Sequence, residues 1–466
     1  MVSFSTIDII VITLFFLSVL AVGFIAGFNA KKDAEGFLLS GRNVGLILFI
    51  LTNVATWYGG ILGIGEFVYR YGILSWVTQG LPYYIFAFLF AIFFAKKIRN
   101  SSLFTIPDKL ILSYNENVGK LSAILVFVLV SPAPYLLMIG NLLSLIVGIE
   151  LWLSLIIGFM LSAAYLFKGG FKSNIYADAV LFFFMFVGFI LILVFALNNF
   201  GGLSYLQDKL PKEHLTFFGN VSPGFIIVWF LIALWTFADP GFHQRCYAAK
   251  SGSVAVKGII ISIFFWFLFD ALTTLTGLFA RASMPELSNP TLSFPLLAEM
   301  VLPSGLKGIF YAALFATIMS TANSFLFLSA TTISRDFIYR FSSKRDDSKL
   351  KTFSIIGLII SGLLSVLLAY FIPSVIEIWY TIGSICIPGI ILPVISAYYT
   401  NLKINSKLLS VEMIVSVTMG FLWFFIRSDF QETFLIDIEP MIVGLIFSAL
   451  IHFAGLIHKF FLPDKR

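Results

Sequence analysis

A stripe of hydroxyl side chains runs along one apolar segment of the sequence. Residues 311–334 form a segment long enough to cross a bilayer. This segment nevertheless carries four hydroxyls, at Thr317, Ser320, Thr321 and Ser324. Their offsets of zero, three, four and seven place them on one face of a helix. Hard cations bind oxygen, and we treat sodium as one of them, so the stripe indicates an ion site. In the alternative, each hydroxyl bonds its own helix or packs against a neighbouring helix.

Polar residues and glycines interrupt a second apolar segment, TNVATWYGGILGIG, at residues 52–65. Non-helical backbone survives at membrane depth where protein or a cavity surrounds it. Secondary transporters build ion and substrate sites from such broken helices. A GxxxG packing seam from Gly59 to Gly63 is the alternative. The seam does not explain Asn53 and Thr56, so we expect a broken helix here.

Several ionisable residues lie in or beside apolar segments, where each costs at least about 2.5–3.5 kcal/mol on insertion scales. Glu66 is expected to pair with Arg70 one turn later. Asp178 is predicted to open the sixth apolar segment, where the helix dipole tolerates an acid. Asp239 is expected to cap a helix or to pair with Arg245.

Asp270 is the acid that is hardest to explain by a helix end. It lies near the middle of the eighth apolar segment, in the stretch FWFLFDALTTLTG. We therefore expect a function for Asp270 or a buried hydrogen-bond network with neighbours such as Thr273 and Thr274. A carrier driven by protons would use Asp270 as its possible coupling group.

The composition is that of an integral membrane protein. Of the 466 residues, 59% are hydrophobic, 12% are charged and 54 are phenylalanine. Thirteen apolar stretches are long enough to be predicted as membrane spans. They are 7–28, 44–69, 73–95, 119–147, 150–167, 176–198, 223–242, 258–280, 303–334, 352–372, 375–399, 408–426 and 440–462.

Basic residues are distributed unevenly between the loops that join these spans. Of the 30 Lys and Arg residues, 24 fall on one side and six on the other. The positive-inside rule then predicts a multi-pass protein of the cell (cytoplasmic or inner) membrane, with its N-terminus outside and its C-terminus in the cytoplasm. No basic stretch interleaved with aromatics indicates nucleic acid. We expect the lipid bilayer as surroundings and no obligatory protein partner.

The sequence contains no motif typical of hydrolytic enzymes or of ATP binding. The four histidines form no HExxH or Ser–His–Asp arrangement, and no Walker-type sequence occurs. We therefore predict that the protein is not an enzyme and that an ion gradient drives it. His452 and His458 are expected to be interfacial or packing residues. Cys246, in a predicted cytoplasmic loop, and Cys386, inside a span, are not expected to pair.

Three stretches together resemble a known family. They are EGFLLSGRNVG at 35–45, DPGFHQRCYAAKS at 239–251 and AALFATIMSTANSFLFLSATTISRDFIYR at 312–340. They are similar to motifs of the sodium:solute symporter family, which includes sodium-coupled sugar, proline, pantothenate and sialic acid transporters. The resemblance covers essentially the whole chain, and it is specific for the family and weak for the substrate.

This resemblance implies an all-α membrane protein with the leucine-transporter fold, in which two five-helix inverted repeats are related to each other. The repeats would span about 44–198 and 223–399. One extra helix at 7–28 would precede them, and two helices at 408–462 would follow, all within a single domain.

The resemblance also implies a sodium site between the first helix of repeat one and the third helix of repeat two. Its carbonyl ligands would come from Asn53, Thr56 and Thr317. Its side-chain ligands would be Ser320 and Thr321.

Some members of the family bind a second sodium ion nearer the cytoplasm. The matching positions here are Asp178, Asn323 and Ser324. Asn323 departs from the usual serine, although an amide oxygen also coordinates hard cations. A second sodium site is therefore possible, and sodium is the one ion that we expect the protein to need.

The resemblance says less about the solute. Where sugar transporters carry polar ligands, this sequence has Gly60, Pro82 and Trp266, and Gln79 alone keeps hydrogen-bonding capacity. Ala55 replaces the acid that proline transporters have in the broken helix. The expected cavity wall is aromatic with a few amides, namely Trp57, Tyr58, Gln79, Asn141, Trp235 and Trp266. Such a wall suits a small organic solute with an apolar part.

The sequence thus predicts a sodium-driven symporter that imports a small organic solute by alternating access. Two alternatives remain. One is a proton-coupled carrier that uses Asp270. The other is a membrane sensor of the same fold that does not transport, which is less favoured because the chain ends shortly after its last span.

Overall fold

The computed structural model describes residues 3–28, 30–31, 33–340, 349–372, 374–430, 435 and 438–461. These residues are almost entirely helical, and their only β contact is an isolated bridge between Val44 and Ala249. Five basic residues that contribute to the predicted charge bias lie outside the described residues, namely Lys32, Lys344, Arg345, Lys465 and Arg466.

Helices follow one another closely in the first half of the chain. In order they are α1 (Thr6–Phe28), α2 (Ala34–Leu39), η1 (Ser40–Arg42), α3 (Leu46–Ala55), η2 (Thr56–Tyr58), α4 (Ile61–Tyr71), η3 (Trp76–Gly80), α5 (Leu81–Phe90), η4 (Ala91–Ala95), α6 (Lys96–Asn100), α7 (Ile106–Ser113), α8 (Glu116–Leu129), α9 (Ala133–Val147), α10 (Leu151–Ala163), α11 (Leu166–Phe200), α12 (Leu203–Lys209) and η5 (Lys212–Leu215).

The second half continues in the same way. Its helices are α13 (Pro223–Ile232), η6 (Ala233–Phe237), α14 (Pro240–Ala248), α15 (Gly252–Ser283), η7 (Pro290–Leu292), α16 (Ser293–Val301), α17 (Leu306–Thr331), η8 (Thr332–Tyr339), α18 (Leu350–Phe371), α19 (Val375–Cys386), η10 (Ile387–Gly389), α20 (Ile391–Tyr398), η11 (Thr400–Leu402), α21 (Ser406–Ile426), η12 (Arg427–Phe430) and α22 (Pro440–Phe461).

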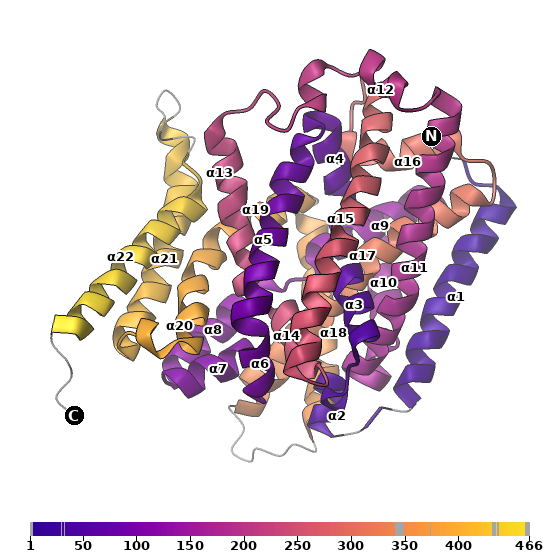
Figure 1. Ribbon diagram of the computed structural model, residues 1–466. Coiled ribbons are helices and arrows are strands. Elements are labelled where there is room, and N and C mark those ends of the chain that lie inside the picture. The colour runs from indigo at the N-terminus through magenta and orange to yellow at the C-terminus, as the bar shows by residue number, and fades with distance from the viewer. Residues whose placement is uncertain are drawn as a thin grey trace.

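The helices account for each predicted span. Within the described residues, 11 helices are long and apolar enough to cross a membrane, and the bent pair Leu46–Tyr58 and Ile61–Tyr71 is a further span. The shorter α10 lies at the remaining predicted stretch, 150–167. The two termini lie at opposite ends of the bundle, as an odd number of spans requires (Figure 1). The all-helical membrane fold is therefore confirmed.

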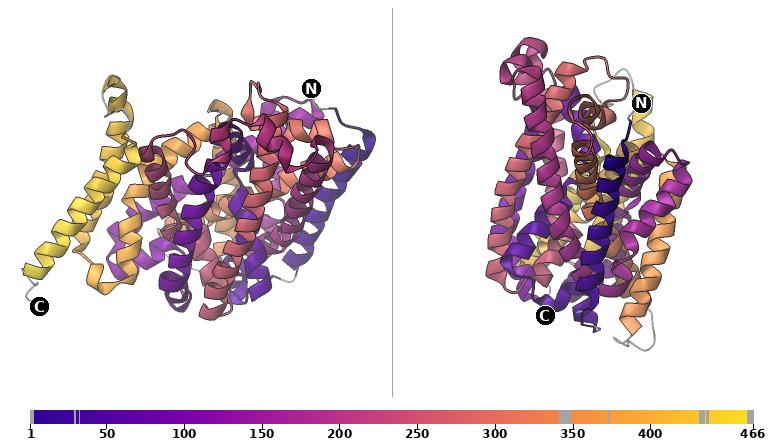
Figure 2. Two further views of the ribbon diagram at one scale, coloured as in Figure 1. Left: turned by 45° about the horizontal axis from the view of Figure 1, so that its top comes forward. Right: turned by 90° about the vertical axis from the view of Figure 1, so that its right-hand side faces the viewer.

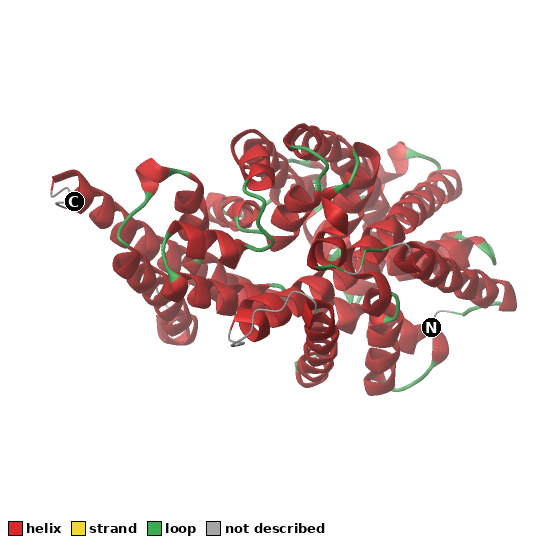
Figure 3. Cartoon of the chain, turned by 90° about the horizontal axis from the view of Figure 1, so that it is seen from below, coloured by secondary structure: helices red, strands yellow, loops and turns green. Residues whose placement is uncertain are grey.

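One helix forms the centre of the bundle. The most apolar part of the run Leu306–Tyr339, which contains α17, is 89% buried inside the protein, against 28% for α1. α17 packs against α1, α9, α11 and α18. The two C-terminal helices, α21 and α22, pack together. They lie on the opposite lateral side of the bundle from α1 (Figures 2 and 3). Because α17 is enclosed by protein, its hydroxyl stripe faces other helices and not lipid.

Two boundaries differ from the prediction. α11 begins at Leu166 and bends at Gly170, where the backbone has φ 56° and ψ −135° and a side chain would collide with the Phe37 carbonyl. Asp178 therefore lies inside a helix, and the prediction that it opens the sixth span is wrong. Arg245 and Cys246 belong to the buried helix α14, where the sequence predicted a cytoplasmic loop. The residues of α14 are polar on average, so the hydropathy of the sequence predicted a loop at this position.

Candidate functional site

The second span is broken at the place where its sequence is irregular. α3 ends at Ala55, and the helix continues as α4 from Ile61 with a bend of 58° between the two parts. The last carbonyls of a helix have no partner within it. One of them, the Thr56 carbonyl, accepts a hydrogen bond of 2.7 Å from the Thr321 hydroxyl of α17. Gly59 permits this approach, because a side chain at that position would overlap Thr321.

The hydroxyl stripe of α17 faces several elements. Thr317 donates to the Leu314 carbonyl of its own helix at 2.7 Å, as the packing alternative expects. Ser320 donates at 2.6 Å to the Asp178 carboxylate, and Thr321 donates to the broken span. Ser324 accepts a bond of 2.8 Å from the Asn174 amide. Three of the four hydroxyls therefore join α17 to other helices.

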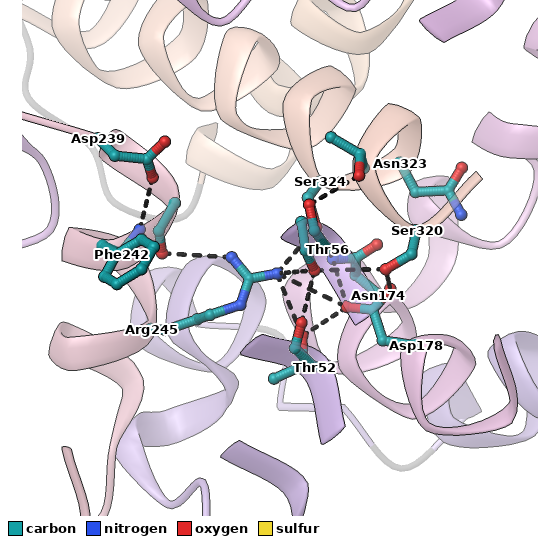
Figure 4. A network of polar contacts seen from close by, with 12 residues as sticks. Thr52, Thr56, Asn174, Asp178, Asp239, Phe242, Arg245, Ser320, Asn323 and Ser324 are labelled. Carbon is teal, nitrogen blue, oxygen red and sulfur yellow. Dashed lines mark hydrogen bonds and ion pairs between the residues drawn. The ribbon is translucent and has the colours of Figure 1, made fainter. Parts of the chain in front are cut away.

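Asp178 lies at the centre of these contacts. Its carboxylate is fully buried and accepts hydrogen bonds from Thr52 at 2.5 Å, Ser320 at 2.6 Å and Asn174 at 3.5 Å. These partners come from α3, α17 and α11 itself (Figure 4). We call the oxygens of Thr52, Thr56, Asp178, Ser320 and Ser324 the oxygen cluster.

The charge of Asp178 is balanced by Arg245, a residue that the sequence placed in a loop. Nη2 of Arg245 lies 3.7 Å from the Asp178 carboxylate, and both side chains are buried. The same nitrogen also lies within hydrogen-bonding distance of the hydroxyls of Thr52, Thr56 and Ser324. Arg245 thus pairs with Asp178 and not with Asp239.

Asp239 serves as a cap. Its carboxylate precedes α14 and accepts a hydrogen bond of 2.8 Å from the Phe242 amide, as the capping alternative predicted. The pair of Glu66 with Arg70, 2.8 Å apart, is also confirmed.

Two amide oxygens beside the oxygen cluster accept no hydrogen bond from the described residues. They are Oδ1 of Asn174 and Oδ1 of Asn323, and both side chains are fully buried. The Asn323 amide nitrogen donates to the Tyr165 hydroxyl instead. Buried acceptors without a donor are costly. A hard cation would satisfy such oxygens, so the donor set fits sodium.

Aromatic side chains gather around Trp57 of the broken span. The Trp57 ring centroid lies 5.0 Å from those of Tyr83 and Trp266 and 5.6 Å from that of Phe242. We call these four residues the aromatic cluster. The Tyr58 hydroxyl donates to the Trp266 carbonyl at 2.9 Å, which ties the broken span to α15.

The other residues predicted for the solute site are more dispersed. Gly60 precedes α4 at the bend, and the buried Gln79 Nε2 has no partner among the described residues. Trp235 packs in a hydrophobic cluster separate from that of Trp57 and Trp266. Asn141 is exposed on α9.

Asp270 lies one helical turn beyond Trp266 on α15. Its side chain accepts a hydrogen bond from the Tyr84 hydroxyl. Thr273 bonds only the backbone carbonyl of Asp270, at 3.2 Å, so the partner that the sequence predicted for this carboxylate is wrong. None of the ion pairs in the described part of the chain involves Asp270.

Comparison with known proteins identifies the family. The family model described as the sodium:solute symporter family matches residues 37–406. The chain belongs to this family.

The symporter is also similar to individual transporters. It is 27% identical over 398 residues to the high-affinity choline transporter 1 of Drosophila melanogaster, a match that covers 80% of this chain and 63% of that protein. It is 28% identical over 364 residues to the sodium/pantothenate symporter of Escherichia coli, covering 74% of each chain.

Solved structures show the fold of the symporter. A substrate-bound, outward-open Na+-coupled sialic acid symporter superposes with a TM-score of 0.84 at 17% identity, covering 99% of both chains. A nucleobase-cation-symport-1 family transporter in a closed conformation gives 0.57 at 13% identity, covering 93% of this chain and 96% of its own. These likenesses show the leucine-transporter fold that the resemblance implied. Membership of the sodium:solute symporter family supports a sodium-coupled symporter of small solutes.

Proposed function

We propose that the protein imports a small organic cation across the cell membrane by sodium-driven alternating access. Sodium binds where the broken span meets α17. The observation that carries this proposal is the 2.7 Å bond between the Thr321 hydroxyl and the Thr56 carbonyl, because it brings an unpaired helix end and the hydroxyl stripe into one place.

The sodium ligands proposed here are the carbonyls of Asn53, Thr56 and Thr317 and the hydroxyls of Ser320 and Thr321. A second sodium binds beside them at Asp178, Ser324 and the free amide oxygen of Asn323. A membrane potential of 100 mV contributes about 2.3 kcal/mol per sodium ion. That energy corresponds to roughly forty-fold accumulation of solute for each ion.

Removal of two hydroxyls tests the sodium site. We expect the double variant Ser320→Ala, Thr321→Ala to need a much higher sodium concentration for uptake into proteoliposomes, with the fold intact. Thr331→Val is the matched control, because this buried hydroxyl of α17 bonds only the Phe327 carbonyl, at 2.8 Å. Wild-type sodium activation in the double variant would contradict the assignment.

The solute site lies at the aromatic cluster. Aromatic faces attract organic cations, most strongly where the site is desolvated. Asp270, which has no basic partner among the described residues, lies one turn beyond Trp266 and supplies negative charge. The relatives named for choline, a quaternary ammonium solute, support the same class.

A pair of matched solutes tests this class. We expect sodium-dependent uptake of choline, or competition by it, and neither for its uncharged isostere, in which a tert-butyl group replaces trimethylammonium. Pantothenate and glucose, the solutes named for other relatives, complete the panel. Uptake of the isostere at the same rate as choline, or of pantothenate or glucose alone, would overturn the cationic class and leave sodium coupling in place.

A further inference from the structure

One nitrogen of Arg245, Nη2, lies close to more oxygens than it can donate hydrogen bonds to. Nη2 lies 2.5 Å from the Thr56 hydroxyl, 3.1 Å from those of Thr52 and Ser324, and 3.7 Å from the Asp178 carboxylate. A guanidinium NH2 group carries two hydrogens, so it cannot donate to all four oxygens at once. Meanwhile Nε of Arg245 is buried without a partner among the described residues. This arrangement lacks the two parallel bonds by which arginine usually binds a carboxylate.

The same oxygens suit a spherical cation better. A hard metal ion has no directional requirement and accepts several oxygens at once. Four oxygens lie within 3.7 Å of this one nitrogen, and Oδ1 of the neighbouring Asn174 accepts no hydrogen bond from the described residues. Two positive charges would repel each other strongly at such a short distance. The guanidinium and a sodium ion therefore cannot both occupy the oxygen cluster.

Arg245 has a second carboxylate within reach. Its Nη1 donates to the Gly241 carbonyl at 3.2 Å. A side chain added at Gly241 would lie 3.3 Å from this Nη1 and 3.0 Å from the Asp239 carboxylate, so both groups border the space that glycine leaves open. Figure 4 shows Asp239 and Asp178 on opposite sides of the guanidinium.

We propose that the second sodium ion, the one bound at Asp178, and the Arg245 guanidinium compete for the oxygen cluster, and that Arg245 moves toward Asp239 when this ion enters. Arg245 is thus a tethered cation that takes the place of the ion. Asp178 then has a positive partner throughout the cycle, so the carrier returns after releasing its sodium without leaving a buried charge unpaired. This inference rests on the proposed sodium coupling.

Replacement of Arg245 by an uncharged residue tests the competition. In Arg245→Gln we expect tighter sodium activation and loss of net uptake, while exchange of labelled for unlabelled solute persists in the presence of sodium. If the guanidinium fills the cluster about nine-tenths of the time, its removal tightens apparent sodium affinity about tenfold. The measurements are sodium titrations of exchange and of net uptake in proteoliposomes.

Two further variants complete the test. Arg245→Lys keeps the charge on a shorter side chain, so we expect net uptake to return in part, and this variant serves if Arg245→Gln does not fold. Arg70→Gln is the matched control, because Arg70 also pairs with an acid, Glu66, but is half exposed, so its loss should leave sodium activation unchanged.

The outcomes separate the two proposals. Sodium-independent uptake by the wild type would refute sodium coupling itself. A sodium-dependent wild type with weaker or unchanged sodium activation in Arg245→Gln would refute the competition alone. Equal loss of exchange and net uptake in both Arg245 variants would show that Arg245 only holds the fold together, and would also overturn the inference.

Discussion

Two buried carboxylates in this protein have opposite surroundings. Asp178 lies among oxygens from α3, α11 and α17, with one arginine nitrogen shared between them. Glu412 lies between α21 and α22, where Ser448 donates to it at 2.9 Å and His452 Nδ1 lies 2.8 Å away. The other His452 nitrogen is 3.0 Å from the Leu402 carbonyl. Each polar group around Glu412 thus has its partner, whereas acceptors outnumber donors around Asp178.

This difference distinguishes a carboxylate site suited to binding an added cation from one that only joins two helices. A complete set of hydrogen bonds fixes two helices that follow each other in the chain. Where acceptor oxygens outnumber donors among helices from distant parts of the chain, as around Asp178, an added cation can satisfy the remaining acceptors. Burial of an acid in a membrane protein is therefore not sufficient evidence of transport function.

Replacement of Asp178 should change transport most. With a second sodium at this acid, the wild type should move two sodium ions per solute, and Asp178→Asn should move one because the charged ligand is lost. Reversal potentials in proteoliposomes give the ratio. Glu412→Gln is the control and should keep the wild-type ratio. A wild-type ratio of one would remove the second site.

At Glu412 we expect the opposite result, a loss of stability without a change in sodium activation. Glu412→Ala leaves the buried side chains of His452 and Ser448 without their partner, and we expect a loss of about 1–3 kcal/mol in the free energy of unfolding for each of them. Denaturant or thermal unfolding in detergent measures this loss. Sodium activation of the protein that remains folded should be that of the wild type. A shift in sodium activation would show that the C-terminal hairpin takes part in coupling.

Asp270, a partly buried acid within α15, offers a further test, because it has neither a surplus of oxygen nor a basic partner among the described residues. In Asp270→Asn we expect KM for an organic cation to rise about tenfold, the equivalent of roughly 1.4 kcal/mol, while sodium still drives uptake. Asp270→Glu should restore part of the affinity.

The same variant decides between sodium and protons. Accumulation driven by a pH gradient alone in sodium-free buffer, and lost in Asp270→Asn, would favour the proton-coupled carrier. Replacement of sodium by potassium should abolish accumulation if the sodium proposal is correct.

Loss of one hydrogen bond between α21 and α22 should have the weakest consequence. Ser448→Ala removes one donor to Glu412 and should cost about 1–3 kcal/mol of stability, because the acceptor stays buried. Uptake and its sodium dependence should not change. Unfolding curves of Ser448→Ala and Ser410→Ala, whose hydroxyl bonds only the Ser406 carbonyl, give the comparison.

The sequence predicted the parts of the site that depend on spacing within one helix. The face shared by Ser320 and Thr321 follows from helical geometry, and the break near Thr56 follows from glycines and polar residues in an apolar span. Both features are present in the fold. Their roles as sodium ligands remain predictions.

Contacts between distant elements could not be predicted in this way. Thr52 and Arg245 meet although 193 residues separate them. The short helix α14 also gave no hydropathy signal, because its polar residues are buried by neighbouring helices and not by lipid. Glu412 did give a signal, as an acid within the predicted span 408–426, and His452 lies on the next span. Sequence alone did not show that they face each other.

The contact between Gly59 and Thr321 has a mechanical consequence. Gly59 has no side chain, and the β-branched Thr321 opposite it is held by its bond to the Thr56 carbonyl, so a rotamer change absorbs little of a displacement there. The contact between the broken span and α17 is therefore stiff. α17 is in turn enclosed by α1, α9, α11 and α18. We therefore expect a shift of the Thr56 carbonyl to be felt by α17 itself and, through α17, by the four helices packed around it.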